Sequence, residues 1–113
     1  MIEATIISYL IDKTSAAKAV YAERPKSPPA KYIIVEKTGS NRADRVDRAT
    51  IAIQSISGTL LDAAMLNDEV KAQMEAILSL ESIGACRLNS DYNFTDQTTK
   101  EYRYQAVFDI THY

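Results

Sequence analysis

Apolar and polar residues alternate along the C-terminal stretch KEYRYQAVFDITHY. Tyr102, Tyr104, Ala106, Phe108, Ile110 and His112 share one parity, whereas Arg103, Gln105, Asp109 and Thr111 share the other. This period of two is typical of a β-strand with one side facing water. Because chain ends fray unless something pairs with them, we expect this strand to be a full member of a sheet.

Four earlier segments also predict extended structure. AAKAVYAE indicates a short strand, and KYIIVEKTG is the most strand-like run, closed by Gly39. TIAIQSIS resumes the alternation, and CRLNSDYNF places Cys86, Leu88, Tyr92 and Phe94 on one side. Between the first two strands, RPKSPPAK predicts a stiff exposed connection, because proline neither continues a helix nor donates to a sheet.

Two segments carry a helical period instead. Ile2, Ile6, Ile7, Leu10 and Ile11 form a narrow apolar stripe near the start of the chain. A longer helix follows GTLLDAAMLNDEVKAQMEAILSLES, with Leu66, Val70, Met74 and Ile77 along one face and Met65 and Met74 expected as core fillers. Thr59 is its expected N-cap, aided by Asp62, and we expect it to end near Ser82 with Gly84 as the turn residue.

The order of elements is therefore one helix, three strands, one helix and two strands. An antiparallel sheet with helices on one face buries every apolar stripe in this order. The sequence predicts a single α+β domain over residues 1–113. Its expected architecture is a single-layer, mostly antiparallel sheet of four to five strands with two helices packed on one face.

Composition and charge narrow the classes of partner. The net charge of −2 shows no excess of basic residues, which proteins that bind nucleic-acid phosphates usually have. We therefore expect no direct nucleic-acid binding. The start MIEATIISYLIDK has no basic leader, and its apolar run is too short to span a bilayer, which predicts a soluble, unsecreted protein without membrane contact. Cys86 is the only cysteine and is expected to be a buried free thiol.

Residues for catalysis or metal binding are few. His112 is the only histidine and is expected to be an ordinary strand residue. The alternate spacing of Asn89, Asp91 and Asn93 resembles that of a calcium-binding loop, but Phe94 occupies the position where such a loop needs glycine. The three glycines are isolated and form no phosphate-binding loop. We therefore expect no catalytic residues, no cofactor and no metal.

The segment NRADRVDRA is the most unusual polar stretch. Arg42, Arg45 and Arg48 recur every three residues, with Asp44 and Asp47 between them. One interpretation is a solvated hairpin loop whose charges satisfy one another. The other is a projecting contact, spanning Gly39 to Asp47 and the adjoining strand ends, that pairs with a neighbouring subunit or another protein.

The whole order of elements resembles the small tail-completion proteins, or tail terminators, of long-tailed bacteriophages and prophages. VYAERPKSPPAKYIIVEKTGS, NRADRVDRA, TIAIQSIS, the helix LLDAAMLNDEVKAQMEAIL and the closing YRYQAVFDITHY carry this resemblance, which covers nearly the entire chain. It implies a non-enzymatic virion protein that forms a homo-oligomeric ring, expected to be a hexamer, on the head-proximal end of the tail tube. Its partners would be further copies of itself, the tail tube protein and a head or neck connector, and it would be in the host cytoplasm during assembly.

Three alternatives remain open at this stage. A head-completion or neck connector protein of the same kind of virion has similar size and composition. A small-molecule binding module would need a pocket lined by Tyr92, Phe94, Tyr102 and Tyr104. An enzyme would have to rely on carboxylates and tyrosines for acid–base chemistry.

Overall fold

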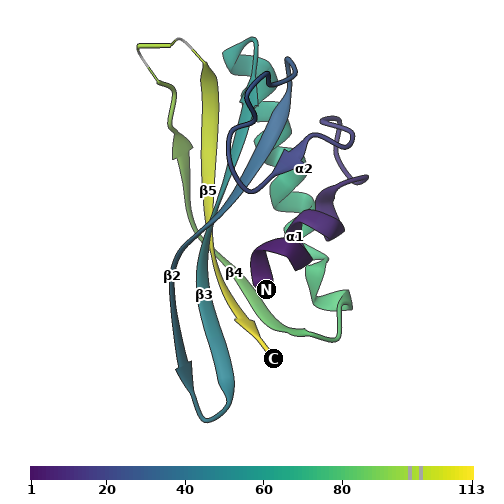
Figure 1. The fold of residues 1–113 in the computed structure, drawn as a ribbon, viewed down its shortest axis with the longest axis vertical. Coiled ribbons are helices and arrows are strands. Elements are labelled where there is room, and N and C mark those ends of the chain that lie inside the picture. The colour runs from purple at the N-terminus through teal and green to yellow at the C-terminus, as the bar shows by residue number, and fades with distance from the viewer. Residues whose placement is uncertain (97, 100) are drawn as a thin grey trace.

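A computed structural model describes residues 1–96, 98–99 and 101–113, which form one five-stranded sheet with two α-helices (Figure 1). The elements are α1 (Ile2–Leu10), β1 (Val20–Tyr21), β2 (Tyr32–Ala43), β3 (Val46–Ser57), α2 (Leu60–Glu75), the short 3-10 helix η1 (Ile77–Ser79), β4 (Ile83–Asn93) and β5 (Tyr102–His112). The strand order is β1-β2-β3-β5-β4. Among the strands of the described residues, β1 alone pairs in parallel, with β2, so the expected mostly antiparallel α+β fold is confirmed.

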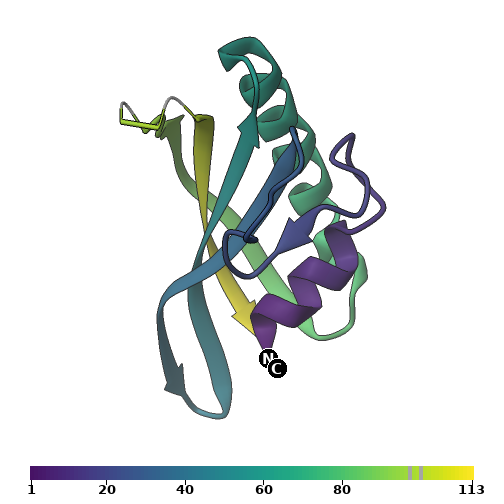
Figure 2. The same ribbon diagram turned by 45° about the horizontal axis from the view of Figure 1, so that its top comes forward.

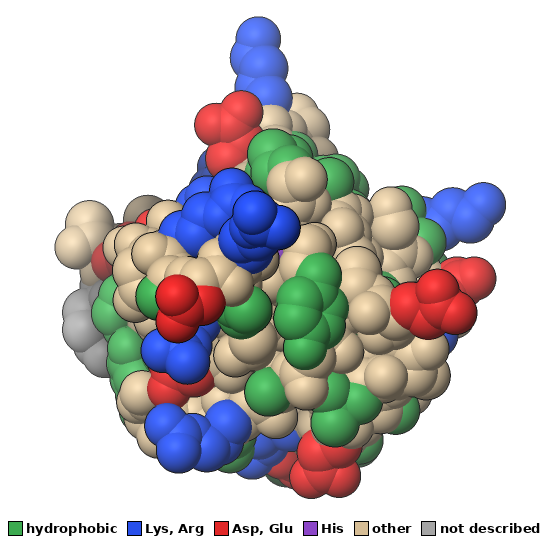
Figure 3. Space-filling view, turned by 90° about the horizontal axis from the view of Figure 1, so that it is seen from below, with side chains coloured by type: hydrophobic (Ala, Val, Ile, Leu, Met, Phe, Trp, Pro, Cys, Tyr) green, Lys and Arg blue, Asp and Glu red, His purple; other side chains and the backbone are tan. Residues whose placement is uncertain are grey.

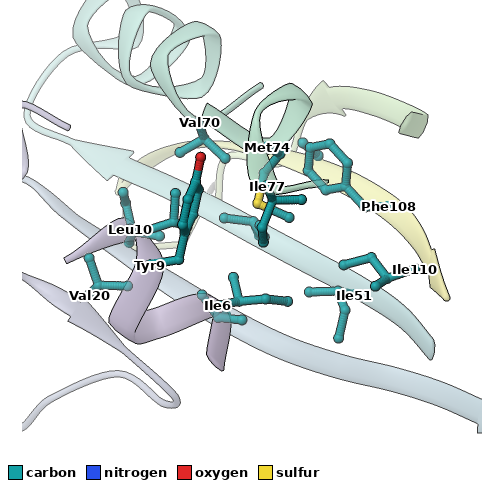
Figure 4. Packing of buried hydrophobic residues seen from close by; sticks show 14 of the residues in the cluster. Ile6, Tyr9, Leu10, Val20, Ile51, Val70, Met74, Ile77, Phe108 and Ile110 are labelled. Carbon is teal, nitrogen blue, oxygen red and sulfur yellow. The ribbon is translucent and has the colours of Figure 1, made fainter. Parts of the chain in front are cut away.

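Both α-helices lie on the same face of the sheet, which we call the helix face (Figure 2). Ile6 and Leu10 of α1 and Val70 and Met74 of α2 are buried there against Ile51 and its neighbours on the strands (Figure 4). Each large aliphatic side chain buried in this way stabilises the fold by roughly 1.5–3 kcal/mol. The apolar stripes predicted for the two helices therefore form one core with the sheet.

The C-terminal strand is a central member of the sheet. β5 pairs with β3 from Tyr102 to His112 and with β4 on its other side. Ala106, Phe108 and Ile110 are buried in the core, as the alternation predicts. The expectation that the final segment is a full sheet strand is confirmed.

The prediction that Cys86, Leu88 and Tyr92 lie on one side of β4 is wrong for the second half of the strand. A register irregularity between Leu88 and Ser90 shifts the alternation by one residue. Cys86 and Leu88 therefore lie on the helix face, whereas Tyr92 is paired with Gln105 on the opposite face. The bulge could not be read from the sequence because no glycine or proline marks it.

α2 begins as predicted but ends earlier. The Thr59 hydroxyl accepts a hydrogen bond from the backbone N–H of Asp62, which confirms the cap. The helix ends at Glu75 and continues only as η1, so the expected end near Ser82 is wrong, and Gly84 is part of β4 rather than a turn. Met74 is fully buried as expected, but Met65 is 57% exposed because it precedes Leu66 and points about 100° away from the core stripe.

A smaller apolar cluster lies on the opposite face. Tyr32, Ile34 and Ile56 form it, with Tyr21 of β1 packed edge-on against Tyr32. The proline-rich connection is tied to this side by Arg24, whose Nε lies 3.2 Å from Glu101 Oε1. Glu101 also accepts a hydrogen bond from the Tyr32 hydroxyl, so one carboxylate ties both Arg24 and Tyr32 to the segment that precedes β5.

Candidate functional site

The charged segment predicted as a loop is a two-stranded ribbon. β2 does not close at Gly39: its register shifts between Lys37 and Gly39, and the strand then continues to Ala43. Backbone pairing with β3 extends to Ala43 opposite Val46. The expectation of a charged loop from Gly39 to Asp47 is therefore wrong, since only Asp44 and Arg45 lie outside the strands.

Asp44 and Arg45 form a tight turn at the tip of this hairpin. Their φ angles are 52° and 67°, so both residues adopt the left-handed region. Two consecutive positive φ angles in a two-residue loop are the pattern of a type I′ turn, which matches the twist of the strands it joins. The turn is a defined structure that presents the Arg45 side chain to solvent.

The sheet distributes the other three candidate residues over two faces. Arg42 and Asp47 are cross-strand partners on the helix face, in the same row as His112. Arg48 lies on the opposite face, paired with Asn41 and Thr111. The five residues predicted as one contact are thus gathered at one end of the molecule but do not form a single flat patch.

Only part of the charge at this end is neutralised within the chain. Arg42 Nε lies 3.6 Å from Asp47 Oδ1, an exposed pair of small energetic value. Neither Arg45 nor Arg48 forms an ion pair with another described residue. Figure 3, which views this end of the molecule, shows lysine and arginine side chains gathered there with acidic ones among them.

Two open grooves flank the base of the hairpin. One, of about 480 Å³, lies on the helix face beside α1 and includes Lys37, Arg42 and His112. The other, of about 550 Å³, includes Arg48 and Arg87. Both are wide and partly polar, so they suit contact with a protein surface better than enclosure of a small molecule.

The outer edge of β2 is paired over only a short distance. β1 contributes two residues, Val20 and Tyr21, opposite Ile33 and Ile34. From Val35 to Ala43 the strand has β3 on one side and no strand of the described chain on the other. An unpaired edge of this length presents backbone donors and acceptors to which another chain can bind.

A cleft of about 230 Å³ lies between α2 and the edge strand β4. Its lining is Met74, Cys86, Leu88 and Phe108, with Lys71 and Glu75 at the mouth. Figure 4 shows Met74 beside Phe108 at the edge of the core. The volume is that of a single large side chain, and the exposed Leu88 leaves its apolar wall open to a partner.

The two charged residues at the mouth of this cleft differ in their environment. Lys71 Nζ lies 3.3 Å from Asp91 Oδ1 and 3.4 Å from Asp68 Oδ1. Burial by itself lowers the Lys71 pKa, but hydrogen bonds and charge interactions with Asp91 and Asp68 raise it overall. Glu75 is exposed and forms no ion pair with another described residue, so its carboxylate is available to an incoming cation.

The remaining candidate side chains take structural positions. His112 is a strand residue of β5, as expected. Cys86 is half-buried, and this burial raises the pKa of its thiol to about 11. Tyr92 and Tyr104 occupy opposite faces of the sheet, so the four aromatic residues considered for a binding pocket do not line one pocket.

Two absences apply to the described parts of the chain. Among residues 1–96, 98–99 and 101–113, no three histidine, cysteine, aspartate or glutamate side chains are grouped so that they could hold a metal ion. In the same residues, no helix has the length and apolar character required to cross a membrane.

Sequence reasoning missed the cleft between α2 and β4. Its residues come from three separate elements, and Leu88 and Glu75 look like ordinary strand and helix positions. The one signal of the cleft in the sequence was that the apolar residues Cys86 and Leu88 alternate with polar ones on a predicted strand with few charges. The strand order, which places β4 at the edge under α2, supplies the rest.

Comparison with known proteins adds no relative. No protein-family model matches the chain, and no curated protein is significantly similar to it.

Proposed function

We propose that the chain is a structural tail-completion protein of a long-tailed bacteriophage or prophage. In this role several copies form a ring, expected to be a hexamer, that caps the tail tube at its head-proximal end. The ring stops growth of the tube and offers a surface to the head or neck connector. In this proposal the protein is located in the virion. It has no catalytic activity, uses no cofactor and does not bind nucleic acid directly.

The observation that carries the proposal is the hairpin end of the sheet. There the two-stranded hairpin presents Arg45 and Arg48 without intrachain ion-pair partners among the described residues, beside an edge of β2 that is unpaired from Val35 to Ala43. Arginine on a defined turn is suited to carboxylate recognition on a protein partner. An open strand edge suits association of chains by backbone pairing.

The site also supplies two unlike surfaces for head-to-tail association of copies. The hairpin tip and the cleft under α2 are different surfaces on one chain, so a contact between them is heterologous. Heterologous contacts generate rings when the rotation closes. A ring with two distinct faces can bind the tube on one side and a connector on the other.

Electron microscopy of particles made without this protein tests the proposal. The gene is deleted from the phage or prophage that encodes it, and tail lengths and head attachment are recorded. We expect abnormally long tails beside filled, unjoined heads, with normal particles restored when the gene is supplied in trans. Tails of normal length that fail to join heads would assign the protein to the neck instead, and intact particles would overturn both virion functions.

A further inference from the structure

We propose that the cleft between α2 and β4 receives the hairpin tip of a second copy, with Arg45 of one chain inserted beside Glu75 of the next. This inference rests on the proposed ring and names the surface that receives the hairpin. The occupant is a second copy of this chain. The contact joins residues 43–46 of one copy to the cleft lined by Met74, Cys86, Leu88 and Phe108 of the next.

The shape of the cleft suits an arginine side chain. The walls are apolar, and the volume of about 230 Å³ accommodates one long side chain. Arginine covers apolar surface with its methylene stem while its guanidinium stays at the polar mouth. In this arrangement the stem of Arg45 packs against Met74 and Leu88, and its guanidinium reaches the carboxylate of Glu75.

The charges of the two surfaces are complementary. α2 carries four acidic residues, Asp62, Asp68, Glu69 and Glu75, and one basic residue, Lys71. Lys71 is already held between Asp68 and Asp91, so the mouth of the cleft remains acidic. The hairpin segment from Arg42 to Arg48 has three arginines and two aspartates. An acidic cleft facing a basic tip favours correct pairing and disfavours contact between two tips or two clefts.

The chain cannot make this contact within itself. In the strand order, β5 lies between the β2–β3 hairpin and β4, and the tip extends beyond the last pairing of β5 with β3 at Asp47. Figure 1 shows the tip at one end of the long axis, away from α2. The tip and the cleft are therefore both available to neighbouring copies.

The backbone of Arg45 adds a second argument. A residue with φ of 67° pays a steric cost that glycine avoids, and this turn type favours glycine at that position. An arginine there is unfavourable for the fold of the isolated chain. A requirement for its side chain in an interface accounts for this choice.

Cysteine cross-linking tests the contact directly, because Cys86 is the only cysteine of the chain and lines the cleft. The D44C variant, which keeps Arg45 and places the new thiol next to it in the turn, is oxidised with copper phenanthroline and separated on a non-reducing gel. Each chain then has one cysteine at its tip and one in its cleft, so the proposed contact links chains into a ladder of trimers and larger species. Mass spectrometry identifies the peptide that joins residue 44 to Cys86.

Three controls isolate this contact. Wild-type protein and the D44C/C86S variant each contain a single cysteine and can yield dimers at most. The S27C variant retains Cys86 and places the new thiol on the exposed proline-rich connection, so its ladder should be lost. A ladder equally strong with S27C would overturn the inference, because it would show random collision.

A charge exchange provides a second readout without a cysteine. R45E and E75K alone should each weaken self-association about tenfold or more, whereas the R45E/E75K double variant should recover most of the loss. Additive losses in the double variant would overturn the contact.

Failure here is distinguishable from failure of the proposed function. If light scattering shows that the D44C variant forms oligomers but no link between residue 44 and Cys86 is found, this contact is overturned and the ring still stands. A monomer without the link would also overturn the contact, while tail length in the deletion experiment decides the ring function independently.

Discussion

Arg45 has a backbone conformation that glycine adopts at lower cost. The fold of the single chain therefore does not require the Arg45 side chain. We predict that R45G raises the free energy of unfolding by about 1 kcal/mol, because the left-handed region is penalised for residues with a Cβ. The same variant should assemble less well. Urea denaturation and a sedimentation assay measure the two effects. A variant that loses stability would show that Arg45 supports the monomer fold instead.

Cys86 makes the free energy of unfolding depend on pH, and the sign of this dependence follows from its pKa shift. Burial raises the pKa of its thiol from 9.0 to about 11. Between these values the unfolded chain loses the thiol proton while the folded chain keeps it, so the free energy of unfolding falls as pH rises. We expect this fall to be steeper in wild type than in C86A. Unfolding by urea at several pH values measures it, and identical slopes in the two proteins would contradict the assignment.

At the scale of single elements, the Thr59 cap fixes the start of α2. Its hydroxyl accepts a hydrogen bond from the backbone N–H of Asp62 at 3.1 Å. We predict that T59A lowers the free energy of unfolding by about 1 kcal/mol, as loss of a helix cap typically does. T98A, in the exposed turn between β4 and β5, is the matched control and should leave stability unchanged. Equal effects of the two substitutions would argue against the cap.

The β2–β3 hairpin is the element expected to mediate assembly. Replacing Arg42, Arg45 and Arg48 together by serine should leave stability within about 0.5 kcal/mol, because all three side chains are exposed. Attachment to tails should be strongly reduced in an assembly assay. The control variant K18S/K26S removes two exposed positive charges elsewhere. Unchanged tail attachment in the triple variant would contradict a role for the hairpin.

The sequence predicted elements better than their details. Alternation identified β5, and the helical stripe with Thr59 identified α2, since both signals are periodic and local. The extension of β2 through charged residues was missed, because polar side chains on an exposed ribbon carry no apolar alternation. The bulge in β4 and the cleft under α2 depend on strand order, which pairs residues far apart in sequence.

At the scale of the whole molecule, the long axis separates different surfaces. The principal extents are 43 × 25 × 24 Å, with the hairpin tip at one end and the start of α2 towards the other (Figure 1). Both chain termini lie near the hairpin end of the sheet (Figure 2). Such polarity suits a subunit that contacts unlike neighbours on its different sides.

The central claim is that copies of this chain close into a ring on the end of a tail tube. The most direct measurement is electron microscopy of tails from the deletion strain after incubation with the purified protein. The account predicts a sixfold ring of added density at one end of each tail and restored attachment of heads. Bare tail ends, with the protein remaining unbound, would contradict it.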